Sequence, residues 1–220
     1  MIYLEKNYVV VGLPGSGKGT QAVKIAEHYM LPHISTGDIF REIQTKDTPL
    51  GKRVKKMLDE GVFVDDKTVF EVVLQKLNTP ELKKGFVFDG FPRNMDQAAF
   101  LEKYRSVTRC VFIDVSDAEC IKRMSSRRIC SDCNANFNII YIKPKKEGIC
   151  DKCNGKLLVR DDSTPEVIKI RMNEYHTKTK PLVGFYEKKG LLLRVDGEQP
   201  IDKVFQDIIA EMGCEKNKII

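Results

Sequence analysis

The segment YVVVGLPGSGKGT, residues 8–20, limits the possible folds of this chain more than any other part of it. Its first five residues form a continuous apolar, β-branched run, which is typical of a strand buried on both faces of a parallel sheet. A glycine-rich loop follows directly, and residues 18–29 then carry apolar side chains at helical spacing. A strand, a glycine-rich loop and a helix in this order indicate an α/β fold that binds a phosphate group.

The glycine-rich loop departs from the general phosphate-loop pattern at one position. Gly19 stands where that pattern has a Ser or Thr whose hydroxyl binds magnesium, and Thr20 comes one residue later. The backbone N–H groups of the loop can still surround a phosphate, with Lys18 as a point charge. An ordinary glycine-rich turn is the alternative, which the preceding strand and the following helix disfavour. We therefore expect a nucleoside triphosphate site built from Gly15, Ser16, Gly17, Lys18, Gly19 and Thr20.

The rest of the chain alternates between strand and helix patterns, which predicts a mainly parallel sheet flanked by helices. Further strands are expected at residues 85–90, 109–115 and 191–197. Helical patterns cover residues 65–77, 94–104, 117–127, 164–188 and 201–212. Thr164 as the cap and Pro165 at the first position mark the start of one of these helices. Residues 35–64 lack a strand signal and are predicted to be a small helical insertion.

Residues 128–160 form a different module, with four cysteines among short apolar runs and turn residues. The pairs Cys130-x-x-Cys133 and Cys150-x-x-Cys153 have the spacing of a zinc site, and four cysteine ligands leave no position open for water. We therefore expect a structural zinc ion. Two disulfides are the alternative, and they suit poorly a chain whose other cysteines lie far apart in sequence. Such a ribbon could also bind nucleic acid or protein. The alternating segment at residues 134–142 is expected to form a tiny sheet.

Composition and charge exclude few function classes. The chain has 220 residues and a net charge of +6, which is compatible with nucleic acid or with small polyphosphates as partners. The basic clusters at residues 52–56 and 143–146 are short and read as solvated surface, so we expect no nucleic-acid partner. Nothing near the N-terminus reads as a signal peptide, and no stretch approaches the roughly 18 apolar residues of a membrane span. We expect a cytoplasmic protein with no membrane partner.

Three motifs, in this order and spacing, resemble the signatures of adenylate kinases: GLPGSGKGTQ at 12–21, STGDIFR at 35–41 and FDGFPRNMDQ at 88–97. The Gly-Lys-Gly-Thr variant is also a habit of that family, and the resemblance extends through the cysteine module to VDGEQP at 195–200. It implies a P-loop core of residues 1–34, 65–125 and 164–220. It also implies an AMP-binding helical insertion at 35–64 and a zinc-ribbon-like lid at 126–163.

Asp89 ends a predicted buried strand, where open α/β sheets bind ligands, and an aspartate there can hold a magnesium-bound water. An isolated aspartate at this place would more simply cap a turn. The resemblance implies that Arg41 and Arg93 hold the phosphate of AMP and that Thr36 and Gln97 contact its adenine. A guanidinium suits the first role because it binds two phosphate oxygens at once. The Phe91-Pro92 bond resembles one that is cis in this family.

A second set of arginines surrounds the cysteine module. Arg123 and Arg127 are four residues apart and share a helix face, Arg160 leaves the module, and Arg171 sits on the next helix. Each alone could be a solvated surface side chain. The resemblance implies that all four arginines contact the triphosphate and the transferred phosphoryl group, and that Arg123 also packs on the adenine of the donor. Asp161 and Asp162 are expected to act at a hinge or as arginine partners.

The resemblance thus implies a monomeric enzyme that converts MgATP and AMP into two ADP and maintains adenine nucleotide balance. No general base is required, because the acceptor is a phosphate oxygen that is already ionised. The predicted catalytic residues are Lys18, Arg93, Arg123, Arg160 and Arg171. ATP is expected to contact the loop with Arg123 and Arg127, and AMP to contact Thr36, Arg41, Arg93, Gln97, Arg160 and Arg171. The alternatives are another monophosphate kinase, GTP as donor, or a non-enzymatic nucleotide switch whose ribbon grips nucleic acid or protein.

Overall fold

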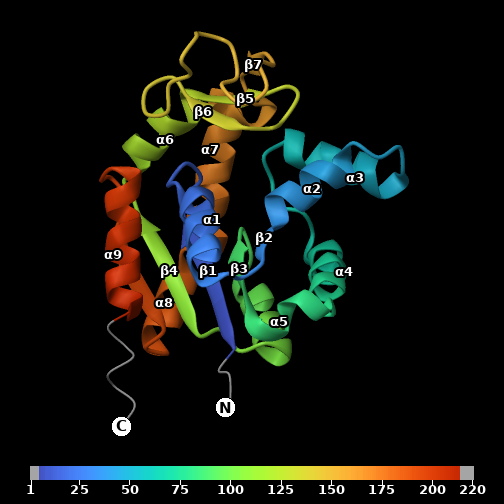
Figure 1. Ribbon diagram of the computed structural model, residues 1–220. Helices are drawn as coiled ribbons and strands as arrows, with labels where there is room; N and C mark the ends of the chain where they lie inside the picture. Colours follow the sequence, from blue (N-terminus) through green and yellow to red (C-terminus); the bar gives the residue numbers. More distant parts are fainter. Residues whose placement is uncertain (1–4, 214–220) are drawn as a thin grey trace.

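A five-stranded parallel sheet with helices on both faces forms the centre of the computed structural model, which describes residues 5–213 (Figure 1). The strand order is β2-β3-β1-β4-β8, and every neighbouring pair is parallel. The bounds are β1 (Lys6–Gly12), β2 (His33–Ser35), β3 (Gly85–Asp89), β4 (Arg109–Asp114) and β8 (Leu192–Asp196). The predicted α/β fold with a parallel sheet is confirmed.

The central strand β1 is buried along its length, as its apolar, β-branched sequence predicts. Val9 is paired with Phe88 of β3 on one side and with Cys110 of β4 on the other, and all three side chains are fully buried. A strand with neighbours at both edges and helices on both faces has no side that meets water, which is why its apolar residues do not alternate with polar ones.

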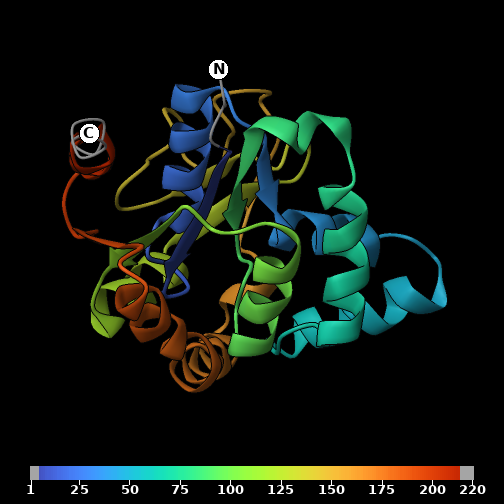
Figure 2. The same cartoon turned by 90° about the horizontal axis from the view of Figure 1, so that it is seen from below.

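Helices cover both faces of this sheet (Figure 2). Helices α1 (Lys18–Tyr29) and α9 (Ile201–Gly213) pack together on one face, and α5 (Met95–Tyr104) and α8 (Pro181–Lys188) pack together on the other. Helix α4 (Asp66–Leu77) lies against α5. Among the helices within residues 5–213, none combines the length and the apolar character that crossing a bilayer requires.

The helical pattern predicted over residues 164–188 is not one regular α-helix. It begins as α7 (Pro165–Glu174), where the Thr164 hydroxyl accepts a hydrogen bond from the N–H of Val167 at 3.4 Å, which confirms the predicted cap. A π-helical turn at Tyr175–Thr179 then precedes α8, and the N–H of Lys180 donates to the carbonyl of Tyr175 at 2.9 Å. Pro181 has no N–H and crowds the preceding turn, so a wider turn accommodates it.

Residues 35–64 contain two helices, as predicted, and extend to one side of the sheet (Figure 1). They contain α2 (Thr36–Gln44) and α3 (Pro49–Asp59). The short strand β2, which ends at Ser35 and precedes them, was not predicted, because three residues are too few to show a periodicity. Short 3₁₀ turns follow at Pro80–Lys84 and Asp161–Ser163.

The cysteine module follows α6 (Asp117–Ser125) and lies beyond the carboxyl end of the main sheet (Figure 1). Its antiparallel sheet has the order β6-β5-β7, with the bounds β5 (Arg127–Cys130), β6 (Asn136–Asn138) and β7 (Leu157–Leu158). The tiny sheet expected over residues 134–142 forms only in part, because residues 139–142 turn away with side chains 40–46 % exposed. The Asn138 Oδ1 holds this turn by accepting from the N–H groups of Ile140 and Tyr141 at 2.9 and 3.1 Å.

Candidate active site

The glycine-rich loop joins the end of β1 to the start of α1. Gly15 and Gly17 have φ angles of +86° and +91°, which other residues rarely adopt. A Cβ atom on Gly15 would lie 2.6 Å from the carbonyl oxygen of Cys120, so the loop backbone packs directly on α6. No side chain caps the N-terminus of α1 at Gly17. The first N–H groups of this helix are therefore available to an anion.

The position of Asp89 explains why glycine occupies position 19. A Cβ atom on Gly19 would lie 2.9 Å from Oδ2 of Asp89, so a Ser or Thr there would crowd this carboxylate. The other oxygen, Oδ1, is buried and has no hydrogen-bond partner among the described residues. A buried carboxylate oxygen without a partner fits a site for a hydrated Mg²⁺ ion, which prefers oxygen ligands.

Lys18 lies at the same edge of the sheet. Its Nζ donates to the carbonyl oxygen of Leu13 at 3.3 Å, which keeps the ammonium over the loop. Burial lowers the pKa of Lys18 to about 8, and the nearby negative charge of Asp89 opposes this shift. A partly desolvated cation at the mouth of an anion site binds a phosphate more strongly than a solvated one would.

The predicted arginines gather around one region, with the exception of Arg123. The prediction that Arg127 shares a helix face with Arg123 is wrong, because α6 ends at Ser125 and Arg127 begins β5. Burial lowers the pKa of Arg93 to about 10, and the charge of Arg171 acts in the same direction. Burial likewise lowers the pKa of Arg127 to about 10, with further contributions from Arg160 and Arg171. Arg41 adds its repulsion to both. Like charges confined in this way favour a ligand that carries several negative charges. The group consists of Arg41, Arg93, Arg127, Arg160 and Arg171.

Asp162 is the acidic partner within this arginine group. Its Oδ2 accepts hydrogen bonds from Nη2 of Arg160 and Nη1 of Arg171, each at 2.5 Å. Burial would raise the pKa of Asp162, but Arg171, Arg160 and Arg127 lower it to about 2. Its expected role as an arginine partner is confirmed, whereas the side chain of Asp161 lies outside the described part of the chain.

Two adjacent pockets meet at Arg93. The first is lined by Thr36 and Gln97 among apolar walls. The second is lined by Lys18 and Arg171. Both pockets share Phe63, Gly90 and Arg93 as lining residues. A cation at this junction can contact a phosphate group that enters from either side.

Several contacts fix Arg93 at this junction. Its Nε donates to the carbonyl oxygen of Gly90 at 2.7 Å, and Thr36 Oγ1 donates to the same oxygen at 2.8 Å. The backbone of Arg93 donates to Gln97 Oε1 and accepts from Thr179 Oγ1, both at 2.8 Å. The preceding Phe91-Pro92 bond is cis, as expected. Sequence reasoning missed Thr179, because it belongs to no motif and reaches Arg93 only through the fold.

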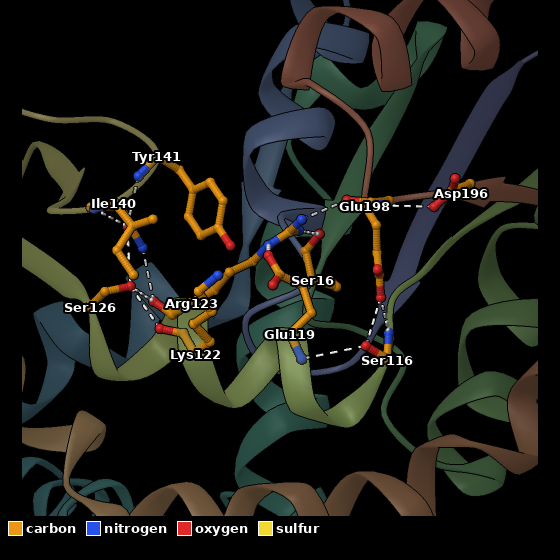
Figure 3. Close-up of polar contacts among 12 residues, drawn as sticks. Ser16, Ser116, Glu119, Lys122, Arg123, Ser126, Ile140, Tyr141, Asp196 and Glu198 are labelled. Atoms are coloured by element: carbon orange, nitrogen blue, oxygen red, sulfur yellow. Dashed lines mark hydrogen bonds and ion pairs between the residues drawn. The ribbon is translucent and has the colours of Figure 1, made fainter.

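The guanidinium of Arg123 forms its hydrogen bonds with residues outside the arginine group (Figure 3). It extends from α6 toward the glycine-rich loop, where Nη1 donates to the carbonyl oxygen of Ser16 at 3.3 Å. Its Nη2 donates to the carbonyl oxygen of Gly197 at 3.0 Å, and Nε donates to Glu119 at 2.7 Å. The ring centroid of Tyr141 is 5.5 Å from its guanidinium carbon. The edges of this guanidinium therefore bind protein groups, which leaves its flat faces for stacking.

The four predicted metal ligands come together in the cysteine module. Their sulfur atoms all lie within 4.8 Å of one another, and all four thiols are free. The sulfur atoms are 3.3 Å apart in Cys130 and Cys153 and 3.6 Å apart in Cys133 and Cys150, far longer than an S–S bond of about 2.05 Å. The arrangement therefore favours one tetrahedral metal over two disulfides.

The two cysteine pairs are built alike. Each is followed by an asparagine in the left-handed region, Asn134 at φ +56° and Asn154 at φ +63°. The N–H of each asparagine donates to the carbonyl oxygen of the first cysteine of its pair, at 3.2 Å for Cys130 and 2.9 Å for Cys150. The backbone N–H groups of Cys133 and Asp132 lower the pKa of Cys130 to about 7. The neighbouring thiols raise the pKa of Cys133 and of Cys153, so a bound cation such as Zn²⁺, whose cysteine ligands are thiolates, would be needed to deprotonate the whole cluster.

Comparison with known proteins agrees with this geometry. The model of the adenylate kinase family matches residues 10–191. An adenylate kinase of Acetivibrio thermocellus is 45 % identical over 94 % of this chain and 98 % of its own length. Adenylate kinases of Caldicellulosiruptor saccharolyticus (42 % identical, over 94 % and 99 %) and Treponema denticola (44 % identical, over 90 % and 95 %) are also similar. The phosphate loop, the arginine group and these matches together place the chain in the adenylate kinase family.

Proposed function

We propose that this protein transfers a phosphoryl group reversibly from MgATP to AMP and so forms two molecules of ADP. The observation that carries this proposal is the position of Arg93 between two pockets, one beside the phosphate loop and one beside Gln97. Its curated relatives carry the name of this activity. The reaction maintains the balance among the adenine nucleotides.

The donor ATP occupies the phosphate-loop side. The N–H groups of the loop and Lys18 hold its phosphates, as the uncapped start of α1 allows. Arg127 contacts the same phosphates in this proposal, which its electrostatic effect on Lys18 supports. Arg123 offers a flat face to the adenine, since its donor edges are held by Ser16, Gly197 and Glu119. In this proposal Arg123 positions the donor and does not touch the transferred group.

The acceptor AMP occupies the other pocket. Its base lies among the apolar side chains that line the pocket, with Gln97 and Thr36 as polar contacts. Its phosphate reaches Arg93 at the junction, and Arg41 adds a second guanidinium from α2, where it pairs with Asp38. Both arginines can bind two phosphate oxygens at once and keep their charge at any physiological pH.

Transfer requires alignment and charge neutralisation more than proton transfer. Arg93, Arg160 and Arg171 surround the place where negative charge develops on the phosphoryl group, with Lys18 on the donor side. Asp89 would hold the hydrated Mg²⁺ ion, which neutralises charge on the donor phosphates when bound. The helical insertion at 35–64 and the module at 126–163 are proposed to close over the substrates and to exclude water.

The four cysteines are proposed to bind a structural Zn²⁺ ion that orders the lid. No position would be left open for water on such an ion, so it takes no part in phosphoryl transfer. We further propose that the enzyme acts as a monomer in the cytoplasm, where free thiols persist, and needs no nucleic acid or membrane.

The test measures nucleoside diphosphate formation by chromatography after mixing the purified protein with MgATP and each of AMP, GMP, CMP and UMP. ADP formation that is rapid with AMP alone is the expected result. Rapid turnover with another monophosphate would contradict the roles given to Thr36 and Gln97. The same assay with MgGTP in place of MgATP tests which nucleoside triphosphate the enzyme uses as the phosphoryl donor. No turnover with any acceptor, together with salt-sensitive binding of a polynucleotide, would favour the nucleotide switch.

A further inference from the structure

The side-chain amide of Gln97 is held in one orientation by groups that lie behind the acceptor pocket. Its Oε1 accepts a hydrogen bond from the backbone N–H of Arg93 at 2.8 Å, and its Nε2 donates to Oδ1 of Asp66 at 2.7 Å. A backbone N–H can only donate and a carboxylate can only accept, so a half turn of the amide would lose both contacts. The oxygen and the nitrogen of Gln97 therefore have fixed places before any ligand binds.

Asp66 is itself fixed between two helices. It is the first residue of α4, where a negative charge interacts favourably with the helix N-terminus. The Nδ2 of Asn94 donates to both of its oxygens, at 3.0 and 3.1 Å. The Oδ1 of Asn94 in turn accepts from the backbone N–H of Gln97 at 2.8 Å and caps α5. Asp66 therefore acts on Gln97 from a place that the start of both helices determines.

The fixed amide offers a specific hydrogen-bonding pattern to the pocket. A glutamine amide has two N–H groups and two lone pairs, and the contacts to Asp66 and Arg93 use one of each. Gln97 is only 1 % exposed and lines the pocket, so one donor and one acceptor remain for a bound base. Adenine matches this pattern, because its 6-amino group donates and a neighbouring ring nitrogen accepts.

A 6-oxo purine presents the wrong pattern to this amide. Its position 6 carries an acceptor, and the neighbouring ring nitrogen at position 1 carries a hydrogen. To bind it, Gln97 would have to turn over, which would set its NH₂ against the N–H of Arg93 and its oxygen against the carboxylate of Asp66. A site whose polar groups are left unpaired by the wrong substrate discriminates strongly against it.

We propose that Asp66 determines the specificity of the acceptor pocket for a 6-amino purine by holding Gln97 in this orientation. Asp66 is a positioning residue, because it is not among the described residues that line the pocket. The inference rests on the proposed function in one respect, namely that the base of the acceptor nucleotide occupies this pocket.

The test compares AMP with IMP, whose bases differ only at positions 1 and 6. The quantity measured is the ratio of kcat/KM for AMP to kcat/KM for IMP, with saturating MgATP. Asp66→Ala removes the acceptor for Gln97 Nε2 and is expected to lower this ratio about tenfold, since a hydrogen bond to a charged group is lost. Both substrates are assayed on one preparation, so the fraction of active enzyme cancels from the ratio.

Asp65→Ala is the matched control. Asp65 is the neighbouring residue and caps the same helix by accepting from the N–H of Thr68 at 3.0 Å, without a hydrogen bond to Gln97. It should leave the AMP to IMP ratio unchanged although it loosens the start of α4. Asp66→Asn, which keeps one oxygen for Gln97, should retain most of the preference for AMP. Asp66→Ser gives a second measurement if the alanine variant does not accumulate in folded form.

An unchanged ratio in Asp66→Ala and Asp66→Ser, or an equal fall in Asp65→Ala, would overturn the role of Asp66. Wild-type protein that phosphorylates AMP and IMP equally well would also overturn it, while the proposed function would stand. Wild-type protein that phosphorylates neither nucleotide would instead overturn the proposed function and this inference with it.

Discussion

Strand β1 of the main sheet lies between two strands and is covered by helices on both faces of the sheet. Strand β5 of the cysteine module also lies between two strands, but it packs against only a small cluster of side chains. The main core joins residues from every strand of the large sheet and from most of the helices that cover it. The core of the module consists of Cys130, Phe137, Cys150 and Leu157, with Ala135 beside them. Half of those four buried side chains are predicted metal ligands.

The two regions therefore depend on different sources of stability. Burying a large apolar side chain contributes about 1.5–3 kcal/mol, so the main core is stable through many such contributions. The module buries too few apolar side chains to offset the entropy of ordering its loops, and a metal can supply the difference. The phosphate loop belongs to the first region and the proposed lid to the second. Chemistry and lid stability should therefore respond to different changes.

Among these predictions, Lys18→Ala in the main core should change a measured quantity most, and it should affect activity without lowering stability. Lys18→Ala should lower kcat by about 10³-fold, because it removes a preorganised positive charge at the phosphate site. The melting temperature should stay the same or rise. Burial lowers the pKa of Lys18 to about 8, so keeping it charged costs stability at neutral pH, and that cost is relieved only as the pH rises above 8. Near-normal turnover in this variant would contradict the role of the loop.

The next effect compares one buried aromatic residue from each region. Phe88 of β3 is fully buried in the main core, and Phe88→Ala should lower the free energy of unfolding by about 3–5 kcal/mol. Phe137→Ala in the module should leave the main unfolding transition in place while the metal is bound. Urea unfolding followed by circular dichroism measures both variants. Equal losses would mean that the two regions unfold as one unit.

Removal of the metal tests the module directly. A chelator should lower the melting temperature of the module by roughly 8–24 °C, which corresponds to about 2–3 kcal/mol for a small unit, and should leave the main unfolding transition in place. Activity measured at temperatures below the melting temperature should fall only because the lid is less ordered, since the metal takes no part in phosphoryl transfer. Elemental analysis should find one zinc ion per chain in the wild-type protein. Each of the four single Cys→Ser variants should contain less zinc. A metal-free protein with four free thiols and normal stability would refute the zinc site.

A smaller effect is expected on the pH dependence of kcat/KM for MgATP, and it arises from Lys18 in the main core and not from the cysteine module. The charge of Lys18 is present below a pKa of about 8 and is lost as the pH rises through that value. The kcat/KM for MgATP should therefore be about tenfold lower at pH 9 than at pH 7, since kcat/KM reports the free enzyme. The kcat should fall less, because bound phosphate favours the charged lysine. Lys18→Arg is the comparison, and its profile should be flat in this range.

Much of the fold could be predicted because its elements are long and periodic. Strands β1, β3, β4 and β8 and the helices between them lie within about two residues of their predicted places. No pattern predicts strand β2, because three residues show no periodicity. The helical pattern over residues 164–188 does not predict the π-helical turn at Tyr175–Thr179, because apolar spacing does not show how Pro181 is accommodated. In the module, the apolar run at residues 139–142 predicted a strand, but the side chain of Asn138 bonds the backbone and makes a turn.

The phosphate loop and the four cysteines can be predicted from the sequence alone, because each lies in a local motif whose spacing carries the chemistry. The arginines around the cysteine module lie in no such motif, and only the resemblance to adenylate kinases singles them out. Three contacts follow from the folded structure and not from any motif: Asp89 crowds a side chain at position 19, Thr179 donates to the carbonyl of Arg93, and Asp66 orients Gln97. Those contacts join residues far apart in the chain. They depend on the order of strands in the sheet and on how the helices pack, which no local pattern records.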